Sequence, residues 1–232
     1  MKRLIALAFA CTLAATASAA ERRENRPVSG FNAIAMGVAM DLDVIQDGTE
    51  SLTLEGDEDV LARVDTFVKD GTLDFMYKRD THFTDTRHRL HAVVHARDMK
   101  AIALSSSGKV RSPSLKSDSL TLSISGSGDM DIGQVAAREA QLSISGSGTI
   151  STAGHVEALK TRISGSGDVK VGKLEARSVA VNIAGSGRAT VWAKEQLSTA
   201  ISGAGNVRYY GDPALAQSIR GVGHVERVAA NP

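Results

Sequence analysis

The feature that most constrains the fold of this chain is a Gly-x-Gly motif repeated along its second half. Six units carry the pattern Ile-x-Gly-x-Gly, and their first glycines are spaced by 20, 19, 20, 18 and 18 residues. A degenerate unit precedes them in phase, with Ser106 in the place of the first glycine. Self-similarity at such a period is typical of repeat architectures. The glycine pairs are Gly126 and Gly128, Gly146 and Gly148, Gly165 and Gly167, Gly185 and Gly187, Gly203 and Gly205, and Gly221 and Gly223.

Aliphatic residues stand at fixed positions around these glycines. An isoleucine lies two residues before each first glycine, and a small or aliphatic residue lies four residues after it. Most positions between them hold serine. Successive side chains of a strand point to opposite faces, so the aliphatic columns should share one face and the serines the other. The predicted core ladder is Ile124, Ile144, Ile163, Ile183, Ile201 and Ile219.

The period predicts an all-β fold, a single-stranded parallel β-helix. A period near 19 residues is too short for strands joined by a helical crossover, whereas stacked turns would place identical residues about 4.8 Å apart. About seven Gly-x-Gly-cornered turns are expected. The glycines should face inward at sharp bends, and right-handed winding is the default for parallel crossovers. A flat antiparallel sheet of hairpins with Ser-Gly turns is the alternative that the same ladders allow.

Residues 28–100 lack the glycine corner but alternate like strands. Examples are the segments 40–45 and 90–96, and Asp70-Gly71 is a hairpin signal. We interpret this part as irregular N-terminal strands that cap the first turn, followed by regular repeats over residues 101–228. The two parts form one expected domain, residues 28–228. An open solenoid end is an unpaired strand edge, so association through the ends is a further expectation.

The first 20 residues have the three parts of a secretory signal peptide. Lys2 and Arg3 precede an apolar run, and Ala17-Ser18-Ala19 supplies a small-x-small cleavage pattern. We expect export to the periplasm or outer envelope of a bacterium, with no transmembrane helix after the signal is removed. Cys11 is the only cysteine. It lies inside the signal, so the mature chain should form no disulfide. Lipidation of Cys11 is the alternative.

The charge balance argues against a nucleic-acid partner. Loss of Lys2 and Arg3 lowers the basic count from 27 to 25 against 26 acidic residues. The mature chain then carries a formal charge of about −1 and no basic-aromatic patch, unlike nucleic-acid-binding domains.

Clusters of polar residues suggest no metal, cofactor or catalytic site. Asp129, Asp131 and Asp168 follow glycine corners, but a calcium ladder needs carboxylates on adjacent turns, and other residue types interrupt this column. Arg162, Asp168 and Lys170 could share one face, as in polysaccharide lyases, yet only their charge marks them. Four histidines are close in sequence, and we interpret them as a solvated strand and loop: His82, His88, His91 and His95.

The repeated Ile-Ser-Gly-Ser-Gly-Asp units, together with Phe31-Asn32-Ala33-Ile34 and Asp70-Gly71-Thr72-Leu73, resemble the family of putative auto-transporter adhesins called the head GIN domain. The resemblance covers roughly residues 28–228. It implies an exported, single-domain β-helical protein of bacterial envelopes.

We therefore expect a non-enzymatic, adhesin-like envelope module that binds a glycan or an envelope protein through the surface of a rigid solenoid. One alternative is a periplasmic structural or signalling-accessory protein that contacts a membrane partner. Another is a carbohydrate-active enzyme. The outward serines are either small residues suited to a tight corner or a flat hydroxyl face that binds a glycan or a partner strand.

Overall fold

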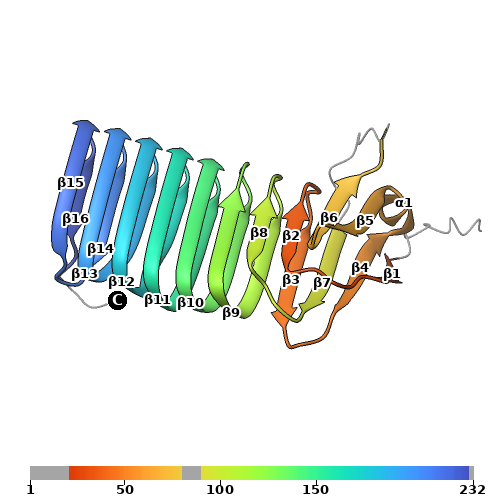
Figure 1. Ribbon diagram of the computed structural model, residues 1–232. Helices are drawn as coiled ribbons and strands as arrows, with labels where there is room; N and C mark the ends of the chain where they lie inside the picture. The colour runs from red at the N-terminus through yellow and green to blue at the C-terminus, as the bar shows by residue number, and fades with distance from the viewer. Residues whose placement is uncertain (1–20, 80–89, 230–232) are drawn as a thin grey trace, which may run out of the picture.

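The computed structural model describes residues 21–79 and 90–229. Strand accounts for 74% of it and helix for 2%, and the strands form a parallel β-solenoid of about six turns, slightly fewer than the seven predicted. Figure 1 shows the turns stacked in one row, from the N-terminal strands at one end to β15 and β16 at the other. The all-β solenoid predicted from the repeats is confirmed.

Each long strand of the regular repeats runs from one glycine corner around the solenoid to the next. Neighbouring turns pair in parallel, and Ile144, Ile163 and Ile183 lie directly in register. This parallel pairing excludes the flat sheet of antiparallel hairpins for these repeats. The strands are β8 (Ala101–Leu104), β9 (Lys109–Ile124), β10 (Asp129–Gly146), β11 (Thr149–Gly165), β12 (Asp168–Gly185), β13 (Arg188–Gly203), β14 (Asn206–Tyr210), β15 (Ala214–Gly221) and β16 (His224–Arg227).

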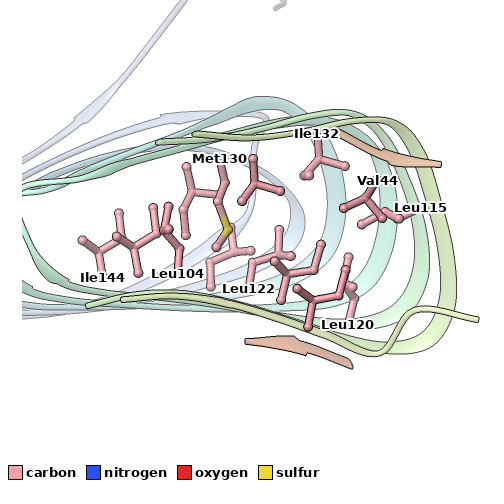
Figure 2. Close-up of a cluster of buried hydrophobic side chains, with 14 of the residues drawn as sticks. Val44, Leu104, Leu115, Leu120, Leu122, Met130, Ile132 and Ile144 are labelled. Carbon is pink, nitrogen blue, oxygen red and sulfur yellow. The ribbon is translucent and has the colours of Figure 1, made fainter. Parts of the chain in front are cut away.

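The interior is a flattened aliphatic core between two sheet faces. Figure 2 shows Leu104, Ile144 and Met130 toward one side of it and Leu115 toward the other. Five ladder isoleucines are at most 2% exposed: Ile124, Ile144, Ile163, Ile183 and Ile201. Ile219 differs from the other five, with 37% exposure, because no further turn covers β15.

The two glycines of a corner serve different purposes. Gly165 adopts φ +134°, and a Cβ on it would lie 2.5 Å from the backbone oxygen of Gly146 in the preceding turn. Gly167 has no such positive φ, but its Cβ would lie 2.5 Å from Cγ2 of Ile144. The first glycine therefore supplies a backbone conformation that other residues rarely adopt. The second leaves room for the core ladder.

The N-terminal part adds turns in an order that differs from the order of the chain. β2 pairs in parallel with β6 on one side and β8 on the other, and β3 lies likewise between β7 and β9. Met36 thereby stands in register with Leu104 and extends the ladder beyond Ile124. The elements are β1 (Glu21–Arg26), β2 (Ala33–Met36), β3 (Asp41–Gln46), β4 (Ser51–Asp57), α1 (Glu58–Leu61), β5 (Val64–Lys69), β6 (Thr72–Tyr77) and β7 (Leu90–Ala96).

The two ends of the solenoid are finished differently. At the N-terminal end, β4 pairs antiparallel with β7 and β5 pairs antiparallel with β6 through the expected Asp70-Gly71 hairpin. β1 then covers the edge of β4, and α1 lies nearby (Figure 1). At the other end every residue of β15 is exposed. The chain thus caps one end with antiparallel strands, while its last parallel turn lies open.

Candidate functional site

The solenoid offers two long faces, one on each side of the glycine corners. The serine face consists of the outward residues of the strands that lead into the corners. Stacked Ser123 and Ser143 are followed in register by Arg162 and Asn182. Over the last turns this face carries a shallow hollow of about 420 Å³, with Arg162 and Arg220 among its lining residues. It is a flat, hydroxyl-rich surface that could support contact with a partner.

The charged face consists of the outward residues that follow the corners. Asp168 and Arg188 lie in register on adjacent turns, and the guanidinium donates two hydrogen bonds of 2.9 and 2.8 Å to the carboxylate. These bonds hold the pKa of the Asp168 carboxyl below its usual range and raise the pKa of Arg188. Asp131 accepts a 3.2 Å hydrogen bond from the Ser151 hydroxyl of the next turn. Side-chain hydrogen bonds thus connect neighbouring turns on the charged face.

A groove crosses the charged face where the regular register breaks. The strand pairing shifts after Ile132, Ser151 and Val171, next to Gly133 and Gly172. Gly133 lies close to the preceding turn, since a Cβ on it would lie 2.6 Å from the backbone oxygen of Pro113. A groove of about 560 Å³ lies along these breaks. Its lining combines hydroxyl, ammonium, carboxylate and aromatic groups: Asp131, Ile132, Gly133, Ser151, Thr152, Ala153, Lys170, Gly172, Lys173, Thr190 and Tyr210.

Tyr210 closes one end of the groove. Its ring reaches back across the turn that contains Thr190, and a Cβ on Gly172 would lie 2.8 Å from the ring atom Cε2. Tyr210 is half-buried and stands in register with Trp192. Trp192, Tyr209 and Tyr210 are the only aromatic residues between positions 101 and 232. Of these three residues, Tyr210 lines the groove, whereas Tyr209 packs against the core.

Lys170 and Lys173 are the cations of the groove. Both side chains are exposed, and neither forms an ion pair within 4.0 Å with any residue that the structure describes. Arg188 and Arg208, which stand just beyond Lys170, are paired with Asp168 and Glu226. The two lysines are thus the ammonium groups left available to a ligand.

Arg162, Asp168 and Lys170, which the sequence suggested could share one face, lie on different faces of the solenoid. Arg162 lies on the serine face, whereas Asp168 and Lys170 lie on the charged face, because the corner at Gly165 and Gly167 stands between them. The hypothesis that these three residues share one face is wrong. The groove was not predicted from the sequence. A usable signal was that the aromatic residues of the repeats all lie near the C-terminal end of the chain.

The two histidines of the predicted cluster that the structure describes contact acidic side chains of neighbouring segments. His91 Nε2 lies 2.9 Å from Asp43 Oδ2 and its Nδ1 lies 3.5 Å from Glu55 Oε2. His95 Nδ1 lies 2.6 Å from Asp47 Oδ2. Both rings are half-exposed, so they link β7 to its neighbours at the surface. His82 and His88 lie outside the described residues.

Residues 21–79 and 90–229 contain neither a metal-binding cluster nor a membrane-spanning helix. No group of three or more His, Cys, Asp or Glu side chains is arranged to hold a metal ion within residues 21–79 and 90–229. In the same part of the chain, no helix has the length and hydropathy needed to cross a membrane.

Comparison with known proteins places the chain. The family model described as "Putative auto-transporter adhesin, head GIN domain" matches residues 30–213. The chain belongs to this head GIN domain family. The resemblance suggested by the glycine repeats is therefore confirmed. A comparison with curated proteins finds no match.

Solved structures share the fold of this head GIN domain over most of its length. A putative adhesin from Bacteroides fragilis is 23% identical with a TM-score of 0.87, covering 91% of this chain and 98% of its own. A putative adhesin from Parabacteroides merdae is 25% identical with a TM-score of 0.66, covering 90% and 96%. A putative lipid binding protein from Parabacteroides distasonis is 22% identical with a TM-score of 0.73, also covering 90% and 96%.

Proposed function

We propose that this head GIN domain is a non-enzymatic, adhesin-like binding module of the bacterial cell envelope, and that it holds a glycan in the groove of the charged face. The observation that carries the proposal is the groove itself, in which the half-buried Tyr210 ring adjoins exposed polar groups from several turns. Binding sites typically combine an apolar or aromatic surface with a few placed polar groups. The signal-like start of the chain and its adhesin family support the envelope location.

The architecture favours binding because the groove is already formed. Its lining comes from five successive turns whose backbones are paired in register on both sides of the break. A preorganised surface loses little conformational entropy when a ligand binds. A chain molecule such as a polysaccharide would lie along the solenoid axis and contact one turn after another.

The polar groups of the groove suit binding better than hydrolysis. Glycoside hydrolysis generally uses two carboxyl groups that flank the scissile bond. Among the described lining residues Asp131 is the one carboxylate, and it is engaged by the Ser151 hydroxyl. Lysines, hydroxyls and an aromatic ring make up the rest of the polar lining. This composition supports recognition of a sugar chain without turnover.

The test is a glycan array followed by isothermal titration calorimetry, using the mature protein and its Tyr210→Ala variant. Loss of the ring should weaken binding of the selected glycan at least about tenfold, which corresponds to about 1.4 kcal/mol. Phe67→Ala is the matched control, since Phe67 is an aromatic residue of β5 with 42% exposure, far from the groove. It should leave affinity unchanged.

The melting temperatures of both variants show whether either change disturbs the fold. If the wild-type protein bound no glycan on the array, or if Tyr210→Ala bound as well as the wild type, the glycan-binding proposal would fail. The alternative of an accessory protein that contacts a membrane partner would then take precedence.

A further inference from the structure

We infer that the groove binds an acidic oligosaccharide and that Lys170 and Lys173 receive its anionic groups. This inference rests on the proposed glycan-binding function and names the class of glycan. Its first basis is the distribution of charge along the charged face. Between β3 and β10 the outward charges alternate from turn to turn, as in Asp41, Lys109 and Asp129, which lie in register. Such alternation neutralises the surface locally.

Toward the C-terminal turns the alternation gives way to an excess of cations. The groove and a second depression beside it on the charged face together contain four cations, and three carboxylates lie in them or face these cations: Lys170, Lys173, Arg188 and Arg208 against Asp131, Asp168 and Glu226. The mature chain as a whole is expected to carry about one net negative charge, so this excess is local. A local positive potential raises the concentration and the association rate of anionic ligands.

The partners of these cations show which of them face a ligand. Arg188 is held by both oxygens of Asp168, and Arg208 lies 4.0 Å from Glu226. Lys170 and Lys173 form no ion pair within 4.0 Å among the described residues, although the charge of Lys170 contributes to the lowered pKa of Asp168. They stand on either side of Gly172, over which the Tyr210 ring lies. An acidic sugar whose ring contacts Tyr210 would place its carboxylate or sulfate beside these two ammonium groups.

The length and polarity of the groove define the ligand further. Lining residues come from five turns, but the Tyr210 ring lies over Gly172 of β12, so at about 4.8 Å per turn the groove between this ring and Asp131 of β10 extends over about 10 Å. This length fits a short oligosaccharide better than a single sugar. Asp131 lies at the end opposite Tyr210 and would repel an anion there. It can instead accept hydrogen bonds from sugar hydroxyls, so the ligand should be oriented with its acidic residues over Lys170 and Lys173.

Titration calorimetry with matched oligosaccharides tests the inference on the whole mature protein. The probes are tetragalacturonic acid, its neutral methyl ester, and a sulfated tetrasaccharide. We expect the acid to bind at least about tenfold more tightly than the ester at 0.05 M salt, and the difference to shrink at 0.5 M salt as screening increases. Preference for the carboxylated or the sulfated probe identifies the anionic group.

The variant Lys170→Gln/Lys173→Gln should lose the preference for the acidic probe while it still binds the methyl ester. Lys160→Gln is the control, because Lys160 is an exposed lysine outside the groove. Its preference should match that of the wild type. A melting temperature within error of the wild type shows that the double variant is folded, as expected for exposed side chains.

Different outcomes overturn different parts of the inference. Equal binding of acid and ester by the wild type would refute the acidic specificity and leave the glycan-binding function standing. If neither probe bound and the glycan array was also negative, both would fall. A third outcome is that inorganic polyphosphate binds as tightly as the acidic probes and that Tyr210→Ala does not weaken the binding of those probes. The lysines would then bind any polyanion through charge alone, and the saccharide site would be refuted.

Discussion

At the residue scale, the glycine corner both turns the chain and leaves space for a core side chain of the preceding turn. The ladder isoleucine of one turn projects toward the second glycine of the next, and Ile144 Cγ2 would touch a Cβ on Gly167. The same contact recurs between Ile163 and Gly187 at 2.5 Å. Repetition of the pair Ile and Gly is therefore a steric requirement between adjacent turns. The motif repeats because each turn must accommodate its predecessor.

Replacing Gly167 with valine should therefore destabilise the protein by about 3 kcal/mol, the upper range for overpacking a core. Urea denaturation followed by circular dichroism measures the loss. The control is Ser166→Val, because Ser166 is the exposed residue between the two corner glycines. We expect it to change stability by less than about 0.5 kcal/mol. Similar losses in both variants would show that the backbone of the corner, and not the space beside Ile144, limits the residue type.

At the element scale, the turn between β3 and β4 is tied to β7 by one carboxylate. Asp47 accepts hydrogen bonds from the Thr49 backbone N–H at 3.1 Å and the Thr49 hydroxyl at 2.8 Å, and its other oxygen lies 2.6 Å from His95 Nδ1. The hydrogen bond with His95, followed by those with Thr49, lowers the pKa of Asp47 from 3.8 to about 2. The turn and the neighbouring strand thus share one acid-sensitive contact.

The depressed pKa gives a pH dependence of definite sign. The folded state binds the Asp47 proton more weakly than the unfolded state, so the contribution is complete above about pH 4 and is lost as the pH falls through about 2. Asp47→Asn should flatten the acid limb of a stability-against-pH curve in that window. Asp118→Asn, at another exposed position, serves as the control. An unchanged acid limb in Asp47→Asn would mean that the contacts of the turn add nothing to stability.

The strands were largely predictable from the sequence, but the order in which they stack was not. Alternation of apolar and polar residues identified most strands, and the spacing of the glycines identified the parallel stacking. Alternation does not encode which turn stacks on which. The placement of β2 and β3 between later segments therefore could not be predicted. The groove was missed for a related reason: Gly172 and Tyr210 are distant in sequence and meet only because the Tyr210 ring reaches back over the one turn between them.

At the scale of the whole molecule, the solenoid is asymmetric. Its N-terminal turns are covered by antiparallel strands, whereas Leu215 and Ile219 of the last turn are 40% and 37% exposed. A solenoid is stabilised by contacts between neighbouring turns, so a turn with one neighbour is held less firmly than a turn with two. Position along the stack should then determine how much a given substitution costs.

A matched pair of substitutions in one column tests this dependence on position. Ile163→Asp places a carboxylate at a site with 0% exposure between two turns, and we expect it to prevent folding, since a buried unpaired charge has no compensating partner. Ile219→Asp makes the same change in the last turn, where the carboxylate can reach water, and should cost no more than about 1 kcal/mol. Circular dichroism and urea denaturation of both variants decide the matter. A normal unfolding transition for Ile163→Asp would show that the ladder is not the core. An equal loss of unfolding free energy in both variants would show that the last turn is covered in solution, because only a covered Ile219 would respond as Ile163 does.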